Sequence, residues 1–343
     1  MRFLGLFFLC ASLSLPSSGA FGEALELFTV ERRLNVEDRQ QTRVGDLVWR
    51  GGIELRSDRD DFGGLSGLLV SSDGREFAAV TDQGRWFSAL LDYDPDGFLE
   101  GLSKPEIGRL HGSDGQALDS KFFQDAESLA ILPDGSILVS FEHDHRILLY
   151  PSKGSDASLA SPLANRPEIW PLSDKMADLP DNDGMEALVE LDQGRLLVVS
   201  AVEDDNGDYE GYLWDGGEWQ TLTLGKSGDY KPTGAAWLPG EDIFLLERQF
   251  SLLGGVGVRL RRIPLDQVQA NSRLVGTEVA EIKPPLIIDN FEGIALHRNA
   301  QGELLVTLLS DDNFSFLQRS LLLMFAVDPP QQSAPLDEAD PSG

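Results

Sequence analysis

Short apolar runs recur along this chain in pairs, and each pair is separated by a tight turn that contains glycine. One example is Glu127 to Ile131, which is followed by the turn Pro133-Asp134-Gly135 and by the run Ile137 to Glu142. Runs of this length and composition around such a turn predict a β-hairpin. Four further segments repeat the pattern, and they begin at Ser66, Glu186, Thr233 and Glu292.

The spacing of these hairpins indicates a repeat architecture. Successive first positions lie 61, 59, 47 and 59 residues apart, and further strand candidates fall between them. These candidates are Trp86 to Tyr93, Ile147 to Tyr150, Tyr209 to Trp214 and Val256 to Ile263. Four strands per repeat at this period are typical of the blades of a β-propeller, and no long helical periodicity competes with that interpretation. We therefore expect an all-β propeller of five blades, or of six if the long connections contain another sheet. An N-terminal strand from Asp46 to Leu55 is expected to complete the last blade and close the ring.

The two ends of the chain differ in composition from the repeats. Residues 1–20 combine Arg2, a short apolar run and the small residues Ser18-Gly19-Ala20, which predicts a cleaved signal peptide and a periplasmic or secreted product. The only cysteine, Cys10, lies in this segment, so the mature chain is expected to have no disulfide and no thiolate chemistry. The propeller domain is expected to span 21–327, and the Pro-rich, acidic residues 328–343 predict a disordered tail.

Charge narrows the choice of partners. The sequence has 28 Lys and Arg against 57 Asp and Glu, a net charge of −29. Such a surface repels phosphate backbones and anionic lipids, so we expect no nucleic-acid partner and no membrane partner. Solubility accounts for the bulk of this charge, and we expect a monomer. Only acids that gather at one place would indicate a site.

The hairpins predict such a gathering. The first strand of each hairpin begins where the second strand ends, so residues at equal distances from the turn lie side by side. The expected inner ring comprises Ser66, Glu127, Glu186, Thr233 and Glu292. The expected outer ring comprises Asp82, Glu142, Glu203, Glu247 and either Asp311 or Asp312. Because like charges at this range repel strongly, the ring is expected to need cations, basic partners or raised pKa values to offset the repulsion. Calcium is the natural cation, since it suits an irregular set of oxygen ligands.

The ring supplies candidates for each chemical role. The candidate metal ligands are Glu127, Glu186, Glu203, Glu292 and Asp311. Asp82, Glu142 and His143 are candidates to take a proton, and Arg85 and Arg248 are candidates to hold an anionic group. The structural alternative is that the acids bond to loop N–H groups, that the cations pair with neighbouring acids, and that His143 belongs to an ordinary polar loop.

Two other motifs are weaker. Ser66 lies in Gly64-Leu65-Ser66-Gly67-Leu68, which departs from the Gly-x-Ser-x-Gly elbow of serine hydrolases. Asp204-Asp205-Asn206-Gly207-Asp208 has some similarity to a calcium loop but lacks the bidentate glutamate, so a surface turn is expected.

Several motifs in order resemble one family. They are Phe62-Gly63-Gly64-Leu65-Ser66-Gly67-Leu68, Thr81-Asp82-Gln83-Gly84-Arg85-Trp86, Asp125-Ala126-Glu127-Ser128-Leu129, Gly184-Met185-Glu186-Ala187-Leu188 and Asn290-Phe291-Glu292-Gly293-Ile294-Ala295. Together they are similar to the bacterial phytase-like propellers, described as having the esterase-like activity of phytase, over residues 46–327. The Glu-Gly-Ile-Ala strand also resembles calcium-binding propellers of the lactonase and strictosidine-synthase kind. The chain departs from alkaline phytases because it lacks a dense set of Lys and Arg, which argues against phytate as its substrate.

Two hypotheses follow from the residues and the resemblance. The first is a calcium-dependent hydrolase of a small-molecule ester or phosphoester, with its active site at the acidic mouth of the channel. The second is a non-catalytic propeller that binds a ligand or partner and uses calcium only for its structure.

Overall fold

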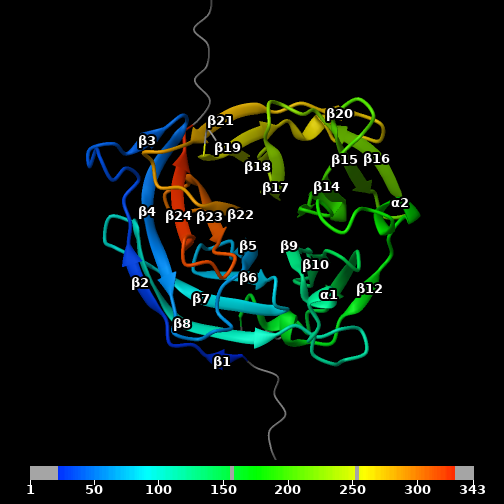
Figure 1. The fold of residues 1–343 in the computed structure, drawn as a ribbon, viewed down its shortest axis with the longest axis horizontal. Coiled ribbons are helices and arrows are strands. Elements are labelled where there is room, and N and C mark those ends of the chain that lie inside the picture. Colours follow the sequence, from blue (N-terminus) through cyan, green and yellow to red (C-terminus); the bar gives the residue numbers. More distant parts are fainter. Residues whose placement is uncertain (1–21, 155–157, 252–254, 329–343) are drawn as a thin grey trace, which may run out of the picture.

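The computed structural model describes residues 22–154, 158–251 and 255–328, and these form a ring of five four-stranded blades (Figure 1). Blade 1 contains β5 (Leu65–Val70), β6 (Glu76–Thr81), β7 (Arg85–Tyr93) and β8 (Leu99–Arg109). Blade 2 contains β9 (Ala126–Ile131), β10 (Ile137–Phe141), β11 (Arg146–Tyr150) and β12 (Glu168–Trp170). Blade 3 contains β13 (Ala187–Glu190), β14 (Leu196–Glu203), β15 (Tyr209–Trp214) and β16 (Trp219–Leu224). Blade 4 contains β17 (Lys231–Ala236), β18 (Ile243–Ser251), β19 (Gly255–Ile263) and β21 (Thr277–Ile282). Blade 5 contains β22 (Asn290–Arg298), β23 (Leu304–Asp311), β24 (Ser320–Val327) and β4 (Leu47–Arg56).

The N-terminal strand closes the ring, as predicted. The outer strand of blade 5 is β4, which pairs antiparallel with β24, so the first and last parts of the chain share one sheet. Two short strands, β2 (Phe28–Glu31) and β3 (Arg43–Val44), extend β4. The short strand β1 (Glu23–Ala24) pairs with β8, and the short strand β20 (Arg273–Leu274) pairs with β16.

Helical segments are short and lie in the connections between strands. They are α1 (Lys121–Gln124), α2 (Asp174–Ala177) and the 3₁₀ turns η1 (Ser161–Ala164), η2 (Asp192–Gly194) and η3 (Leu265–Gln267). In the described part of the chain no helix is long and apolar enough to cross a membrane.

The hydrophobic core settles the number of blades. Buried side chains form five clusters, and each cluster lies between two neighbouring blades, around the full circle. The interface between blades 1 and 2, for example, buries Val80 and Trp86 against Val139 and Phe141. The inner strands contact one another in the order β5, β9, β13, β17, β22 and back to β5. The described residues therefore form a closed ring of five blades.

The predicted hairpins are all present. The turn glycines Gly74, Gly135, Gly194, Gly240 and Gly302 all have positive φ, as tight turns between these strands require. All five inner strands therefore begin at the same end of the ring, which we call the mouth. The predicted signal peptide and nearly all of the predicted tail lie outside the described residues.

Candidate functional site: the carboxylate-lined mouth

Strand pairing fixes which residues reach the mouth. In blade 2, Glu142 lies opposite Asp125, and its N–H donates to the carbonyl oxygen of Asp125 at 2.9 Å. The same register places Asp82 opposite Gly64 in blade 1, Arg248 opposite Lys231 in blade 4 and Asp311 opposite Asn290 in blade 5. Blades 1, 2, 4 and 5 thus each supply a second-strand residue, a residue opposite it, and the inner-ring residue two positions further along the chain. In blade 3 the Ala201 N–H donates to the carbonyl oxygen of Asp183, three residues before Glu186.

Bulges direct three of the inner-ring side chains. Glu127, Thr233 and Glu292 are each the extra residue of a β-bulge, with no partner of their own on the second strand. A bulge re-aims the side chain of its extra residue and is common beside functional sites.

Blade 2 is the most acidic blade at the mouth. Oxygens of Asp125, Glu127 and Glu142 lie within 4.8 Å of one another, a spacing that suits a shared cation. Burial, reinforced by Glu186 and Glu142, raises the pKa of Glu127 well above its usual range. Burial also raises the pKa of Asp125 and of Glu142, whose Oε1 accepts from the N–H of Gly184 at 2.9 Å.

Two neighbouring blades add acids to this group. The side chains of Glu142 and Glu186 lie within hydrogen-bonding reach, and burial together with Glu142 and Glu292 raises the pKa of Glu186. Glu292 accepts from the Ser66 hydroxyl at 3.0 Å and from Asn290 Nδ2 at 2.9 Å, and burial raises its pKa too. Carboxylates this close cannot all be ionised without a cation or a shared proton.

Asp82 and Asp311 form the other acidic side of the mouth. Burial raises the pKa of Asp82 to about 7, with a contribution from Asp125, and raises the pKa of Asp311 to about 8, with a contribution from Glu292. Asp82 Oδ1 is buried and has no hydrogen-bond partner. It rests against Gly64, where an added Cβ would lie 2.0 Å from that oxygen.

Blade 4 brings positive charge to the same ring. Arg248 donates to Asn290 Oδ1, and its Nη2 lies 3.7 Å from Glu292 Oε1. Lys231 pairs with Asp183 at 2.5 Å. Arg248 therefore lies at the mouth beside the carboxylates, with its exposed side available to an anionic group.

The histidines lie beside blade 2. His143 Nε2 lies 3.0 Å from Asp125 Oδ2, and His145 Nε2 lies 2.8 Å from the carbonyl oxygen of Pro180. His143 is thus placed to relay a proton or to orient Asp125.

The structure corrects three of the predicted positions. Glu203 lies on the exposed rim and pairs with Lys226, because β14 is irregular after Val199 and Ala201 takes the backbone pairing at the mouth. Glu247 is one residue short of the ring position that Arg248 occupies, so it points into blade 4, where it is fully buried between Arg259 and Arg261. Arg85 pairs with Asp61 at 2.6 Å and contacts none of the mouth carboxylates.

The structure also places the alternative ring residues Asp311 and Asp312 and the segment 204–208. Asp311 faces the ring, whereas Asp312 accepts from the N–H of Gly64 and from the Ser320 hydroxyl, each at 3.0 Å. The segment 204–208 is a surface turn, as predicted, in which Asp204 caps its own loop and Asp208 pairs with Arg273.

Sequence reasoning missed Asp125 and Asn290 as members of the site. Both lie two residues before an inner-ring glutamate, in Asp125-Ala126-Glu127 and Asn290-Phe291-Glu292. Because side chains alternate along a strand, that period of two could have identified them.

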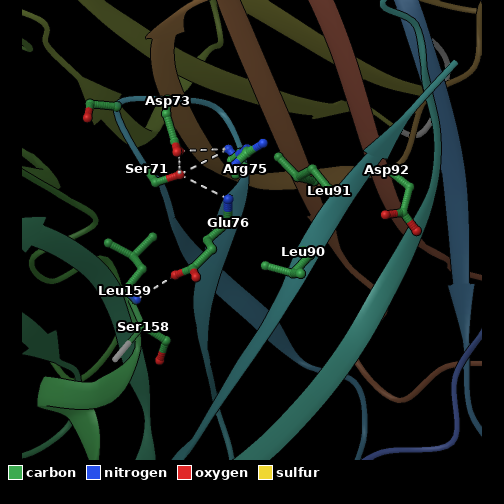
Figure 2. Close-up of a pocket in the computed structure, with 10 residues that line it drawn as sticks. Ser71, Asp73, Arg75, Glu76, Leu90, Leu91, Asp92, Ser158 and Leu159 are labelled. Carbon is green, nitrogen blue, oxygen red and sulfur yellow. Dashed lines mark hydrogen bonds between the residues drawn. The ribbon is translucent and has the colours of Figure 1, made fainter. Parts of the chain in front are cut away.

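Cavities elsewhere are less suited to chemistry. A cavity of about 620 Å³ lies at the turn of the blade 1 hairpin, away from the mouth. Ser71, Asp73, Arg75 and Glu76 help to line it. Figure 2 shows that its polar groups bond to one another: Ser71 Oγ donates to Asp73 at 2.7 Å and accepts from the N–H of Glu76 at 2.9 Å. Its three carboxylates, Asp73, Glu76 and Asp92, each already accept a hydrogen bond.

The buried carboxylates of blade 2 are grouped closely enough to bind a metal ion. The three grouped donors are all carboxylate oxygens of blade 2, and at the neighbouring blade 1 the buried Asp82 Oδ1 has no hydrogen-bond partner. Calcium takes six to eight such ligands in irregular geometry. Asp125, Glu127 and Glu142 would hold the ion, with Glu186 and Glu292 adjacent.

The fold and the site together define a five-bladed propeller with a carboxylate-lined mouth. The chain belongs to the phytase-like family, since the family model described as "esterase-like activity of phytase" matches residues 60–314. No curated protein matches the chain significantly.

Among solved structures, the chain is similar to several distant propellers. A protein of unknown function from Dyadobacter fermentans is 11% identical, with a TM-score of 0.44 over 90% of this chain and 96% of that one. A gluconolactonase from Xanthomonas campestris is 13% identical, with a TM-score of 0.39 over 90% and 89%. The PQQ-bound aldose sugar dehydrogenase of Streptomyces coelicolor is 14% identical, with a TM-score of 0.41 over 89% and 99%. Resemblances this distant carry no argument on function.

Proposed function

We propose that this protein is an exported, calcium-dependent hydrolase of a small-molecule ester or phosphoester, and that the reaction takes place at the mouth. The observation that carries the proposal is the juxtaposition of the blade 2 carboxylates with Arg248 across one small ring. A group of acids that can bind a cation, beside a guanidinium that can bind an anion, suits metal-assisted hydrolysis of an ester or phosphoester. The family membership supports the same class of reaction.

The residues divide into three roles. Asp125, Glu127 and Glu142 would hold the ion, which when bound would polarise the carbonyl or phosphoryl group of the substrate and lower the pKa of a water molecule. Asp82 accepts the proton of the attacking water, since its pKa is raised to about 7 and its Oδ1 has no other partner. Arg248 binds the oxygen that becomes negative in the transition state.

The balance of the reaction is that of hydrolysis. The water oxygen bonds to the acyl carbon or phosphorus, the ester C–O or P–O bond breaks, and the proton on Asp82 passes to the departing alkoxide. His143, bonded to Asp125, is the alternative proton acceptor.

Location and partners follow from the sequence. The predicted signal peptide would direct the protein out of the cytoplasm. Extracellular proteins commonly use weak calcium sites. A net charge of −29 disfavours nucleic acids and anionic membranes, and the protein is proposed to act as a monomer.

The test is hydrolysis of 4-nitrophenyl acetate and 4-nitrophenyl phosphate by the mature protein, in calcium and in chelator. We expect turnover that requires calcium, that is lost in Glu127→Gln, and that persists in Glu100→Gln, a matched change of an exposed acid on β8. Turnover equal in wild type and Glu127→Gln would refute the proposal. Calcium binding without any turnover would favour the non-catalytic alternative.

A further inference from the structure

Large apolar side chains are exposed on the connections that surround the mouth. Six of the eleven exposed large hydrophobic residues in the described part of the chain lie at this end of the blades. They are Phe122 and Phe123 at α1, Phe250 near the end of β18, and Phe314, Phe316 and Leu317 between β23 and β24. The remaining five are spread over other surfaces. Single exposed apolar side chains are common on proteins, but several at one end of the molecule indicate a binding surface.

The loop after β23 holds an aromatic ring beside Asp82. Asn313 and Phe314 both have left-handed backbone conformations, with φ of 47° and 49°. This conformation is uncommon for residues other than glycine and is strained for a bulky residue such as Phe314. Asp312 maintains this conformation, since its Oδ1 accepts from the N–H of Phe314 at 3.1 Å and from that of Gly64 at 3.0 Å. The loop is therefore fastened to the segment against which Asp82 rests.

Gly64 shows how close the ring and the carboxylate are. An added Cβ at this position would lie 2.7 Å from Phe314 Cε2 and 2.0 Å from Asp82 Oδ1. Phe314 and Asp82 thus both lie on the side of Gly64 where a side chain would project, so the ring and the carboxylate are close together. A strained backbone that presents an apolar ring at this point has no evident benefit for folding, because 41% of Phe314 stays exposed.

A second aromatic ring reaches the site from blade 2. Phe122 stacks on His143 with ring centroids 6.2 Å apart and an interplanar angle of 13°. His143 in turn bonds to Asp125, one of the three grouped carboxylates. Phe123 packs edge-on against Phe122 at 5.2 Å, which fixes the position of the pair.

We propose that the substrate carries an aromatic or compact apolar group next to its hydrolysable bond, and that Phe122 and Phe314 bind this group. The inference rests on the proposed function and names its substrate class. A small ligand is favoured over an anionic lipid surface, because the rings surround a group of carboxylates on a strongly acidic protein. Partial burial of two phenyl rings against a ligand ring is expected to strengthen binding by about 10-fold.

The test compares two non-hydrolysable anions, phenylphosphonate and methylphosphonate, by calorimetry on the calcium-loaded protein. Phenylphosphonate is expected to bind about 10-fold more tightly, and the double variant Phe122→Ala/Phe314→Ala is expected to bind both equally. Phe28→Ala, which removes an exposed ring from β2, is the matched control and should keep the preference. Melting temperatures of both variants show whether the fold is intact, since all three rings are exposed.

The outcomes separate the two proposals. Equal affinity of the wild type for both anions, or no binding of either, overturns the inference. Calcium-dependent sedimentation with phosphatidylcholine vesicles that the double variant abolishes also overturns it, because the rings would then bind a membrane. A preference for phenylphosphonate without hydrolysis of any ester upholds the aromatic binding site formed by Phe122 and Phe314 and refutes the proposed function.

Discussion

Blades 2 and 4 share the same hairpin, the same register and the same bulge, yet they bring opposite charges to the mouth. Blade 2 places Asp125, Glu127 and Glu142 at its three mouth positions. Blade 4 places Lys231, Thr233 and Arg248 at the corresponding positions. Its acid, Glu247, is one residue away and is neutralised inside the blade by two arginines. The comparison shows that position relative to the bulge, and not the presence of an acid near the strand end, determines what reaches the site.

The largest effect is expected from removing an acid of blade 2. Glu127→Gln should lower kcat/KM by at least about 100-fold and weaken calcium binding, because it removes a charged oxygen at the centre of the group. In chelator the same variant should melt at a higher temperature than the wild type, since it relieves repulsion between buried carboxylates. Steady-state kinetics measure kcat/KM, calorimetry measures calcium binding, and thermal melts measure the melting temperature. If Glu127→Gln melts at a lower temperature than the wild type in chelator, Glu127 is stabilised by protein partners and not by a cation.

Removing the arginine of blade 4 should have a narrower effect, on hydrolysis but not on calcium binding. Arg248→Met is expected to lower kcat/KM by about 100-fold while calcium affinity is kept or increased, because a positive charge beside Glu292 is lost. Steady-state kinetics at saturating calcium measure the first effect. Loss of calcium binding in this variant would contradict the division of roles between the two blades.

How the acid side behaves with pH is the next test. Asp82 and Asp311 have pKa values raised to about 7 and about 8, so the folded, calcium-free protein binds more protons than the unfolded chain between about pH 4 and pH 8. Their contribution to stability is therefore complete below pH 4 and is lost as the pH rises through 7 and 8. In chelator the melting temperature should fall by at least about 5 °C from pH 5 to pH 9, and calcium should reduce this decrease. A melting temperature that rises over this range would contradict the raised pKa values.

The smallest effect is expected from the rim. Glu203→Gln should change kcat/KM by less than about 2-fold, since Glu203 pairs with Lys226 at an exposed position. Kinetics beside Glu127→Gln provide the comparison. An effect as large as that of Glu127→Gln would place Glu203 in the site, as its sequence position first suggested.

Much of this architecture could be predicted from the sequence, because hairpin turns and two-sided burial leave a local pattern. The five inner-ring positions and the closing strand are where the pattern placed them. The residues opposite them could not all be predicted, because a bulge or an irregular strand shifts the register by one residue, and one residue reverses the face. That shift exchanges Glu247 for Arg248 in blade 4 and moves Glu203 to the rim in blade 3.

The contacts between blades were also beyond the sequence. Nothing in the local pattern indicates that Asp312 fastens its loop to Gly64, or that Arg85 turns to Asp61. Such contacts join segments far apart along the chain, and only the closed ring brings them together.

The central claim is that the cation at the mouth and the hydrolysis are one function, and calcium titration of the chelator-treated protein tests it most directly. Heat of binding and rate of 4-nitrophenyl ester hydrolysis would be measured against free calcium in the same buffer. We expect the rate of hydrolysis to rise with the same midpoint as calcium binding, and Glu127→Gln to lose both together. Full hydrolysis before any calcium is bound would contradict it.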